Sequence, residues 1–168
     1  MDALLALDQR MFLAVHGGPE ATRRFARGVS RSGDGWTYAL LALLLTFTPW
    51  STAPLHLRSL ALGFALELPV CFALKFALRR ERPHVVLRGL TGAFRAADRF
   101  SFPSGHACAA ALHAVILGHH APLAAPLVAA WALAVAWSRV RLGVHFPLDV
   151  VAGALVGAAC GGLALNLF

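Results

Sequence analysis

Long apolar runs separated by short polar segments dominate this chain of 168 residues. Such runs are typical of helices that cross a lipid bilayer, because a hydrocarbon core about 30 Å thick requires about 20 largely apolar residues. Trp36 and Trp50 bound the first run, where the aromatic belt of a membrane helix would place them. The pattern predicts five spanning helices, at about 36–50, 57–79, 104–120, 122–138 and 147–168.

The segment before these runs has a different pattern. Residues 2–16 mix leucine and alanine with charged residues, and they are too short and too interrupted to fit a spanning helix. They predict a helix that lies at the membrane interface. Residues 17–35 are rich in glycine, arginine and serine and predict a polar connection. We therefore expect a single domain over 1–168, an all-α transmembrane bundle of five to six helices, with an interfacial helix and linker over 1–35.

The second predicted span contains residues that are unusual in a membrane. Pro69 removes a backbone donor and should kink the helix near the middle of the bilayer. Glu67 is an ionisable group within a span, which is costly and often functional. Two interpretations of Glu67 stay open: it pairs with a polar group below the site, or it lines a groove for the substrate.

Composition narrows the class of protein. Hydrophobic residues make up 58% of the chain, charged residues 14%, and the mean hydropathy is +0.67, which excludes an ordinary soluble domain. The 15 Lys and Arg exceed the 8 Asp and Glu, for a net charge of +7. An apolar chain without a soluble basic domain does not suit nucleic acid. Arginine binds phosphate through two parallel hydrogen bonds, so anionic lipid headgroups and a phosphorylated substrate are the better match.

Three polar clusters stand at the ends of the predicted spans. Five crossings would bring all of these ends to the same face of the membrane. The clusters are Lys75 to Arg82-Pro83, Phe102-Pro103-Ser104-Gly105-His106, and Ser138-Arg139 followed by His145 and Asp149.

These residue types suit phosphoryl transfer, which needs cations around the phosphate, a nucleophile and an acid for the leaving group. Lys75, Arg82 and Arg139 supply the cations from three helix ends. Ser104 and Gly105 open a helix, whose free N–H groups and positive dipole end can hold phosphate oxygens. Such a site needs no metal or other cofactor, and the sequence shows no carboxylate or His/Cys pattern typical of a metal centre. The three cysteines are predicted to be apolar packing residues.

Two histidines are left for the chemical steps. Asp149 follows His145 by four residues, about one helical turn, and can accept the hydrogen of one imidazole nitrogen while the other acts as nucleophile. His106 has no obvious carboxylate partner nearby in sequence. It suits protonation of the leaving oxygen and then activation of water.

Here the chain resembles the type 2 phosphatidic acid phosphatase family, whose signature is K-x6-R-P, P-S-G-H and S-R-x5-H-x3-D. Every element is present at the family's spacing between residues 75 and 149. The resemblance implies a phosphohistidine at His145, oriented by Asp149, with His106 as acid and base. It also implies a membrane bundle that hydrolyses lipid phosphates without a metal.

The substrate expected from this reading is phosphatidic acid, phosphatidylglycerol phosphate or a polyprenyl (pyro)phosphate, reached from the surrounding membrane lipids. Two alternatives stay open: a phosphotransferase that uses the same histidine with an acceptor other than water, and, more remotely, an anion transporter. The expected location is the bacterial cytoplasmic (inner) membrane, and the sequence does not indicate an oligomeric state.

The side of the membrane that carries the motifs is left open by the sequence. With five spans, Arg58 is the only Lys or Arg on the opposite face, so the positive-inside rule places the motifs in the cytoplasm. Many bacterial members of the family act on the outer face instead. Counting residues 2–16 as a sixth span would give that arrangement.

Overall fold

The computed structural model describes residues 2–47, 49, 51–87, 89–90 and 98–167. These residues form helices and contain no strand, which confirms the all-α prediction. The elements are α1 (Asp2–His16), α2 (Glu20–Ser32), α3 (Gly35–Leu45), α4 (Ala53–Leu78), the short α5 (Pro83–Val86), α6 (Gly105–His120), the 3₁₀ turn η1 (Pro122–Ala124), α7 (Ala125–Arg141) and α8 (Pro147–Asn166).

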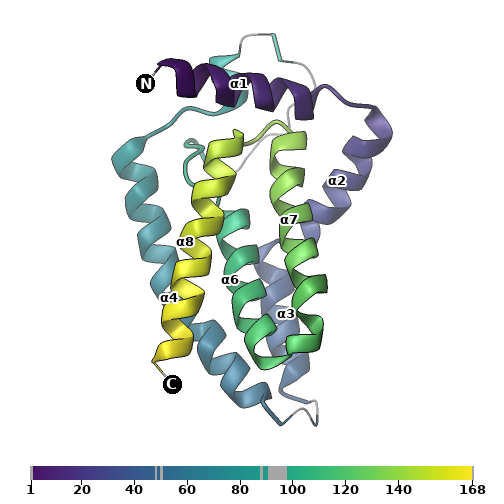
Figure 1. Ribbon diagram of the computed structural model, residues 1–168, viewed down its shortest axis with the longest axis vertical. Helices are drawn as coiled ribbons and strands as arrows, with labels where there is room; N and C mark the ends of the chain where they lie inside the picture. Colours follow the sequence, from purple (N-terminus) through teal and green to yellow (C-terminus); the bar gives the residue numbers. More distant parts are fainter. Residues whose placement is uncertain (1, 48, 50, 88, 91–97, 168) are drawn as a thin grey trace.

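The central helix of the bundle is α6, which packs against α4, α7 and α8 (Figure 1). Leu112 and Ile116 of α6 are fully buried and form a core cluster with Leu60 of α4 and Cys160 of α8. The close approach of α8 to α6 depends on small residues. A Cβ at Gly157 would collide with the backbone of Cys108.

Within the part of the chain that the structure describes, three segments are long and apolar enough to cross a membrane: Ala53–Val86, Pro122–Arg141 and Pro147–Asn166. Large apolar side chains on their outer surfaces are exposed, including Phe72, Leu133 and Leu155, as expected where lipid replaces water. The protein is therefore an integral membrane helix bundle. Pro69 lies inside α4 without ending it. The count of five to six crossings stays a prediction.

The first predicted span is shorter than expected. Helix α3 ends at Leu45, and with 11 residues it is shorter than a membrane crossing requires. Trp50 lies outside the described residues. In Figure 1, α2 and α3 follow one another along the bundle.

The prediction of a polar connection over 17–35 is wrong, because α2 occupies most of it. Its composition is misleading because the arginines and serines are arranged on a strongly amphipathic helix. Ala26 and Ser30 are buried, and α2 packs against α7. The helix is thus polar on its outer side and still part of the bundle.

Helix α1 lies across one end of the bundle rather than along it (Figure 1). Residues 2–16 are helical as predicted. One side of α1 is docked on the protein, since Asp8, Phe12 and His16 are all buried. The Phe12 ring packs edge-on against Phe146 and stacks on His16. The opposite side of α1 exposes leucines and Met11.

Candidate active site

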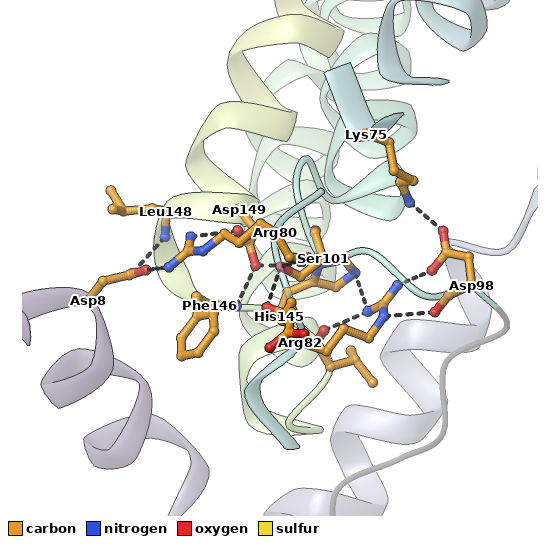
Figure 2. A network of polar contacts seen from close by, with 12 residues as sticks. Asp8, Lys75, Arg80, Arg82, Asp98, Ser101, His145, Phe146, Leu148 and Asp149 are labelled. Atoms are coloured by element: carbon orange, nitrogen blue, oxygen red, sulfur yellow. Dashed lines mark hydrogen bonds and ion pairs between the residues drawn. The ribbon is translucent and has the colours of Figure 1, made fainter. Parts of the chain in front are cut away.

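The motif residues lie at the end of the bundle that α1 covers, and Figure 2 shows Lys75, Arg82, His145 and Asp149 among them. They come from the end of α4 and the linker to α5, from the start of α6, and from the end of α7, the α7–α8 linker and the first turn of α8. These are the helix ends that the sequence predicted to share one face. Their side chains are polar yet largely enclosed: Arg82, Ser104, His145 and Asp149 are all buried.

His145 is held in one orientation by a backbone carbonyl. Its Nδ1 lies 2.7 Å from the carbonyl oxygen of Ser101. Because a carbonyl only accepts, Nδ1 must carry the hydrogen, which leaves Nε2 with a free electron pair. Nε2 faces Nη1 of Arg82 at 3.5 Å. The nitrogen available for nucleophilic attack is therefore Nε2.

The electrostatic surroundings keep His145 neutral. Burial lowers the pKa of His145 to about 4, and the charges of Arg82 and Arg139 act in the same direction, while Asp149 opposes them. At neutral pH the imidazole is therefore uncharged, as a nucleophile must be.

Asp149 is not the direct acceptor that the sequence led us to expect. Its nearest oxygen lies 3.8 Å from Nδ1 of His145, beyond hydrogen-bond distance. Oδ2 instead accepts the backbone N–H of Phe146 at 2.8 Å, which caps α8, and Oδ1 accepts from Nη1 of Arg80 at 2.6 Å. The i,i+4 spacing brought the two residues together, but the intervening Ser101 carbonyl could not be foreseen.

Lys75 and Arg82 converge on the carboxylate of Asp98. Each donates to a different oxygen of that carboxylate, and Nε of Arg82 also donates to the Asp98 carbonyl at 3.0 Å. Burial opposes ionisation of Asp98, but the hydrogen bonds and charges of Lys75 and Arg82 lower its pKa below the usual range. The side chain of Asp98 is 48% exposed. An anion thus occupies the space between the two predicted phosphate-binding cations.

Arg139, Ser104 and Gly105 occupy the remaining predicted phosphate positions. Nη1 of Arg139 donates to Ser30 of α2, and its buried Nε has no hydrogen-bond partner among the described residues. The hydroxyl of Ser104 is also buried without a partner in that part of the chain. Its backbone N–H, however, donates to the carbonyl of Asp149 at 2.9 Å and is not free for an anion. Gly105 begins α6 and lines a cavity beside His106.

His106 has a carboxylate partner that is remote in sequence. Its Nε2 lies 2.8 Å from Oδ1 of Asp34, which precedes α3. The only signal in the sequence is indirect: Asp34 stands between Gly33 and Gly35, where a helix break is expected.

Arg80, which is not part of the family signature, points into the site. Its guanidinium joins the buried carboxylates of Asp8 and Asp149 and lies 4.5 Å from the centre of the Phe146 ring (Figure 2). Nothing in the spacing of Arg80 distinguished it from the adjacent Arg79.

A cavity of about 540 Å³ leads from the site between the helices. Lys75, Asp98 and His106 line it near the motifs. The rest of its lining is mostly apolar and is formed by α3, α4 and α6, with side chains such as Ala42, Leu60, Phe64, Leu68 and Ala109.

Glu67 is buried and lines this cavity. Its role in a substrate groove stays a prediction. Oε1 of Glu67 accepts from Sγ of Cys71 at 3.1 Å, and the same Sγ lies 2.8 Å from Sγ of Cys108 of α6. The cysteines are free and buried. The ligand atoms of these three residues lie within 4.8 Å of one another, close enough to hold an ion, which the sequence did not reveal because Cys108 belongs to another helix.

The fold and the site together define a membrane helix bundle that gathers histidines and cations for phosphate chemistry at one end. The sequence matches the PAP2 superfamily over residues 56–168, and the chain belongs to this family.

Three relatives illustrate this membership. YbjG of Escherichia coli, named as a candidate undecaprenyl-diphosphatase, is 34% identical over 119 residues, covering 70% of this chain and 60% of that protein. Decaprenylphosphoryl-5-phosphoribose phosphatase of Mycobacterium tuberculosis is 31% identical over 147 residues, covering 82% of this chain and 76% of that protein. The crystal structure of Aquifex aeolicus LpxE superposes with a TM-score of 0.85 at 26% identity, covering 94% of this chain and 93% of LpxE.

Proposed function

We propose that this chain is a membrane phosphatase that hydrolyses a lipid phosphate or polyprenyl (pyro)phosphate through a phosphohistidine at His145. The observation that carries the proposal is the hydrogen bond from Nδ1 of His145 to the Ser101 carbonyl. It fixes the tautomer in which Nε2 is a nucleophile facing Arg82.

In the first step, Nε2 of His145 forms a bond to phosphorus as the bond from phosphorus to the leaving oxygen breaks. His106 gives a proton to that oxygen. The phosphorylated imidazole keeps its Nδ1 hydrogen and so carries a positive charge. That charge is balanced by the Ser101 carbonyl and by the Asp149 carboxylate 3.8 Å away.

In the second step, His106 takes a proton from water, and the resulting oxygen attacks phosphorus. The N–P bond breaks, the electron pair returns to Nε2, and inorganic phosphate leaves. Lys75, Arg82 and Arg139 stabilise the phosphate charge in both steps. In the free protein Asp98 neutralises Lys75 and Arg82, so the substrate phosphate displaces Asp98 from these cations.

The apolar cavity supports a substrate with a long hydrocarbon chain. Its apolar lining lies between helices whose outer surfaces expose large apolar side chains, so a hydrocarbon chain could enter from the bilayer. The relatives are named for undecaprenyl diphosphate and for a decaprenylphosphoryl sugar phosphate. We therefore place a polyprenyl phosphate or diphosphate first among substrates, and the bacterial cytoplasmic membrane as the location.

The test is turnover by the purified protein in detergent. We expect inorganic phosphate to be released from polyprenyl diphosphate and from phosphatidic acid without an added acceptor, and an acid-labile phosphoryl group to be trapped on the wild type. His145→Ala should abolish both signals, and His106→Ala should cost turnover severely. Persistent turnover in a clean His145→Ala preparation would exclude the mechanism, and phosphate transfer only with an added acceptor would indicate a phosphotransferase.

A further inference from the structure

Two carboxylates that lie outside the region matched to the family contact the catalytic machinery. Asp8 belongs to α1 and Asp34 to the break between α2 and α3, whereas the family match begins at residue 56. We propose that both are positioning residues, each for a different part of the reaction. Asp8 acts through Arg80 on Asp149, and Asp34 acts on His106. This inference rests on the phosphohistidine function proposed above.

The buried carboxylate of Asp8 makes specific polar contacts with Arg80 and Leu148. It is only 1% exposed, although most of α1 is exposed. Oδ2 accepts from Nη2 of Arg80 at 2.5 Å, and Oδ1 accepts the backbone N–H of Leu148 at 2.9 Å (Figure 2). Burying a carboxylate is costly unless it is paired with a cation and hydrogen-bonded, and both conditions are met here. Asp8 therefore ties α1 to the first turn of α8.

Arg80 transmits this restraint to Asp149. The same guanidinium that binds Asp8 donates through Nη1 to Oδ1 of Asp149 at 2.6 Å, and the Phe146 ring supports its face. Two anions on one guanidinium fix its plane more firmly than either would alone. Asp149 is thereby held as an anion 3.8 Å from the imidazole of His145, where it can stabilise the cationic phosphohistidine.

Asp34 restrains His106 from the other side of the site. The end of α2 packs closely on α7, since a Cβ at Gly33 would lie 2.9 Å from the Val135 side chain. The 2.8 Å contact between Oδ1 of Asp34 and Nε2 of His106 assigns the hydrogen to Nε2, because a carboxylate only accepts. Nδ1 is then the nitrogen of His106 that exchanges a proton with the leaving oxygen and with water.

The two roles predict different kinetic defects. Asp34 serves proton transfer to the leaving oxygen, which matters little when that oxygen is a good leaving group such as a nitrophenolate. It also serves activation of water in the second step, which no choice of leaving group can bypass. Asp8 serves the phosphohistidine itself, so its loss should slow formation of this intermediate for every leaving group. A general loss of structure would slow both steps with both substrates, and would not give the two variants these different defects.

The experiment compares Asp8→Asn, Asp34→Asn and the control Glu20→Gln with the wild type, using para-nitrophenyl phosphate in a rapid-mixing instrument and a lipid phosphate in steady state. Glu20 is an exposed acid of α2 that pairs with Arg23 and Arg27. Full-length proteins of matched melting temperature are compared. If Asp8→Asn does not fold, Asp8→Glu replaces it.

For Asp34→Asn we expect lipid-phosphate turnover to fall about tenfold or more, while the first-turnover release of nitrophenol changes by less than about twofold. A burst followed by a slow phase should result. For Asp8→Asn the first-turnover release of nitrophenol and the steady-state turnover of the lipid phosphate should both slow about tenfold. Glu20→Gln should match the wild type.

The inference is overturned if the wild type forms the phosphoenzyme and both variants behave like Glu20→Gln, or if both lose all phases equally. Failure of the proposed function gives a different result, in which the wild type traps no phosphoryl group and His145→Ala retains turnover.

Discussion

The Nδ1 hydrogen of His145 is donated to the backbone carbonyl of Ser101, at 2.7 Å. Ser101 precedes the P-S-G-H motif, so the segment that opens α6 also orients the nucleophile between α7 and α8. A side-chain carboxylate is usually assigned this task, but here Asp149 is farther away and is engaged by Arg80 and Phe146. Backbone and carboxylate thus divide two roles, one fixing the tautomer and the other supplying charge.

This division predicts a moderate effect for Asp149→Asn. Replacing a carboxylate that directly orients a catalytic histidine costs about 10⁴-fold in kcat. Since Ser101 still holds the imidazole, we expect a smaller loss, of about 10- to 100-fold, with KM little changed. Steady-state kinetics on a lipid phosphate measure both constants. A loss as large as that of His145→Ala would contradict the role assigned to the Ser101 carbonyl.

The pKa of His145 predicts a wide range of pH in which the nucleophile is ready. Burial lowers this pKa to about 4, so the ring is neutral at and above pH 5 and becomes protonated only as the pH falls through about 4. In nuclear magnetic resonance spectra of histidine-labelled protein, a ring signal that titrates near pH 4 should be present in the wild type and missing in His145→Ala. Titration of that ring near pH 6.5, the ordinary value, would show that the site is wetter than the structure indicates.

The motif residues could be predicted from the sequence because the chemistry fixes both their types and their spacing. Lys75, Arg82 and His145 lie at one end of the bundle as expected. Their partners could not be predicted, because each comes from a segment distant in the chain. The contacts of Asp8 with Arg80 and of Asp34 with His106 span 72 residues each.

The same limit explains the error at α2. Local composition predicted a linker over 17–35, but the helix is stabilised by packing on α7 and on the segment after it, where Ala26 forms a cluster with Leu142 and Val144. Tertiary packing of an amphipathic face outweighs weak local propensity. Length and hydropathy were reliable for α4, α7 and α8, whose apolar residues are mostly not buried inside the protein.

Asp98 should compete with the substrate phosphate. Its carboxylate bridges Lys75 and Arg82, and those cations lower its pKa. Removing the charge in Asp98→Asn leaves both cations unneutralised, so we expect KM for the substrate and the inhibition constant for inorganic phosphate to fall by about threefold to tenfold. Inhibition curves with phosphate measure the effect. A rise in both constants would mean that Asp98 instead holds the cations in their binding geometry.

The apolar cavity predicts that chain binding and chemistry can be separated. Ala42 lines the cavity on α3, two turns beyond Asp34, so Ala42→Phe should fill space needed by a hydrocarbon chain. We expect KM for a long-chain phosphate to rise about tenfold, with turnover of para-nitrophenyl phosphate unchanged. Ala130→Phe, on the exposed surface of α7, is the matched control. Equal effects of the two variants on both substrates would show that the hydrocarbon chain of the substrate does not bind in this cavity.

Packing between α6 and α8 predicts opposite effects for two glycines of the same helix. A Cβ at Gly157 would meet the carbonyl oxygen of Cys108, which is backbone and cannot move aside, whereas a Cβ at Gly162 would meet nothing within 4 Å. Gly157→Ala should therefore lower the free energy of unfolding by about 1–3 kcal/mol through overpacking. Gly162→Ala should leave it unchanged or raise it by up to about 1 kcal/mol, because alanine favours the helix. Thermal unfolding in detergent compares the two directly.

Because α8 begins with the turn that carries Asp149, we also expect Gly157→Ala to lose activity at temperatures where Gly162→Ala remains active. Equal melting temperatures would show that α8 can shift away from α6 without loss.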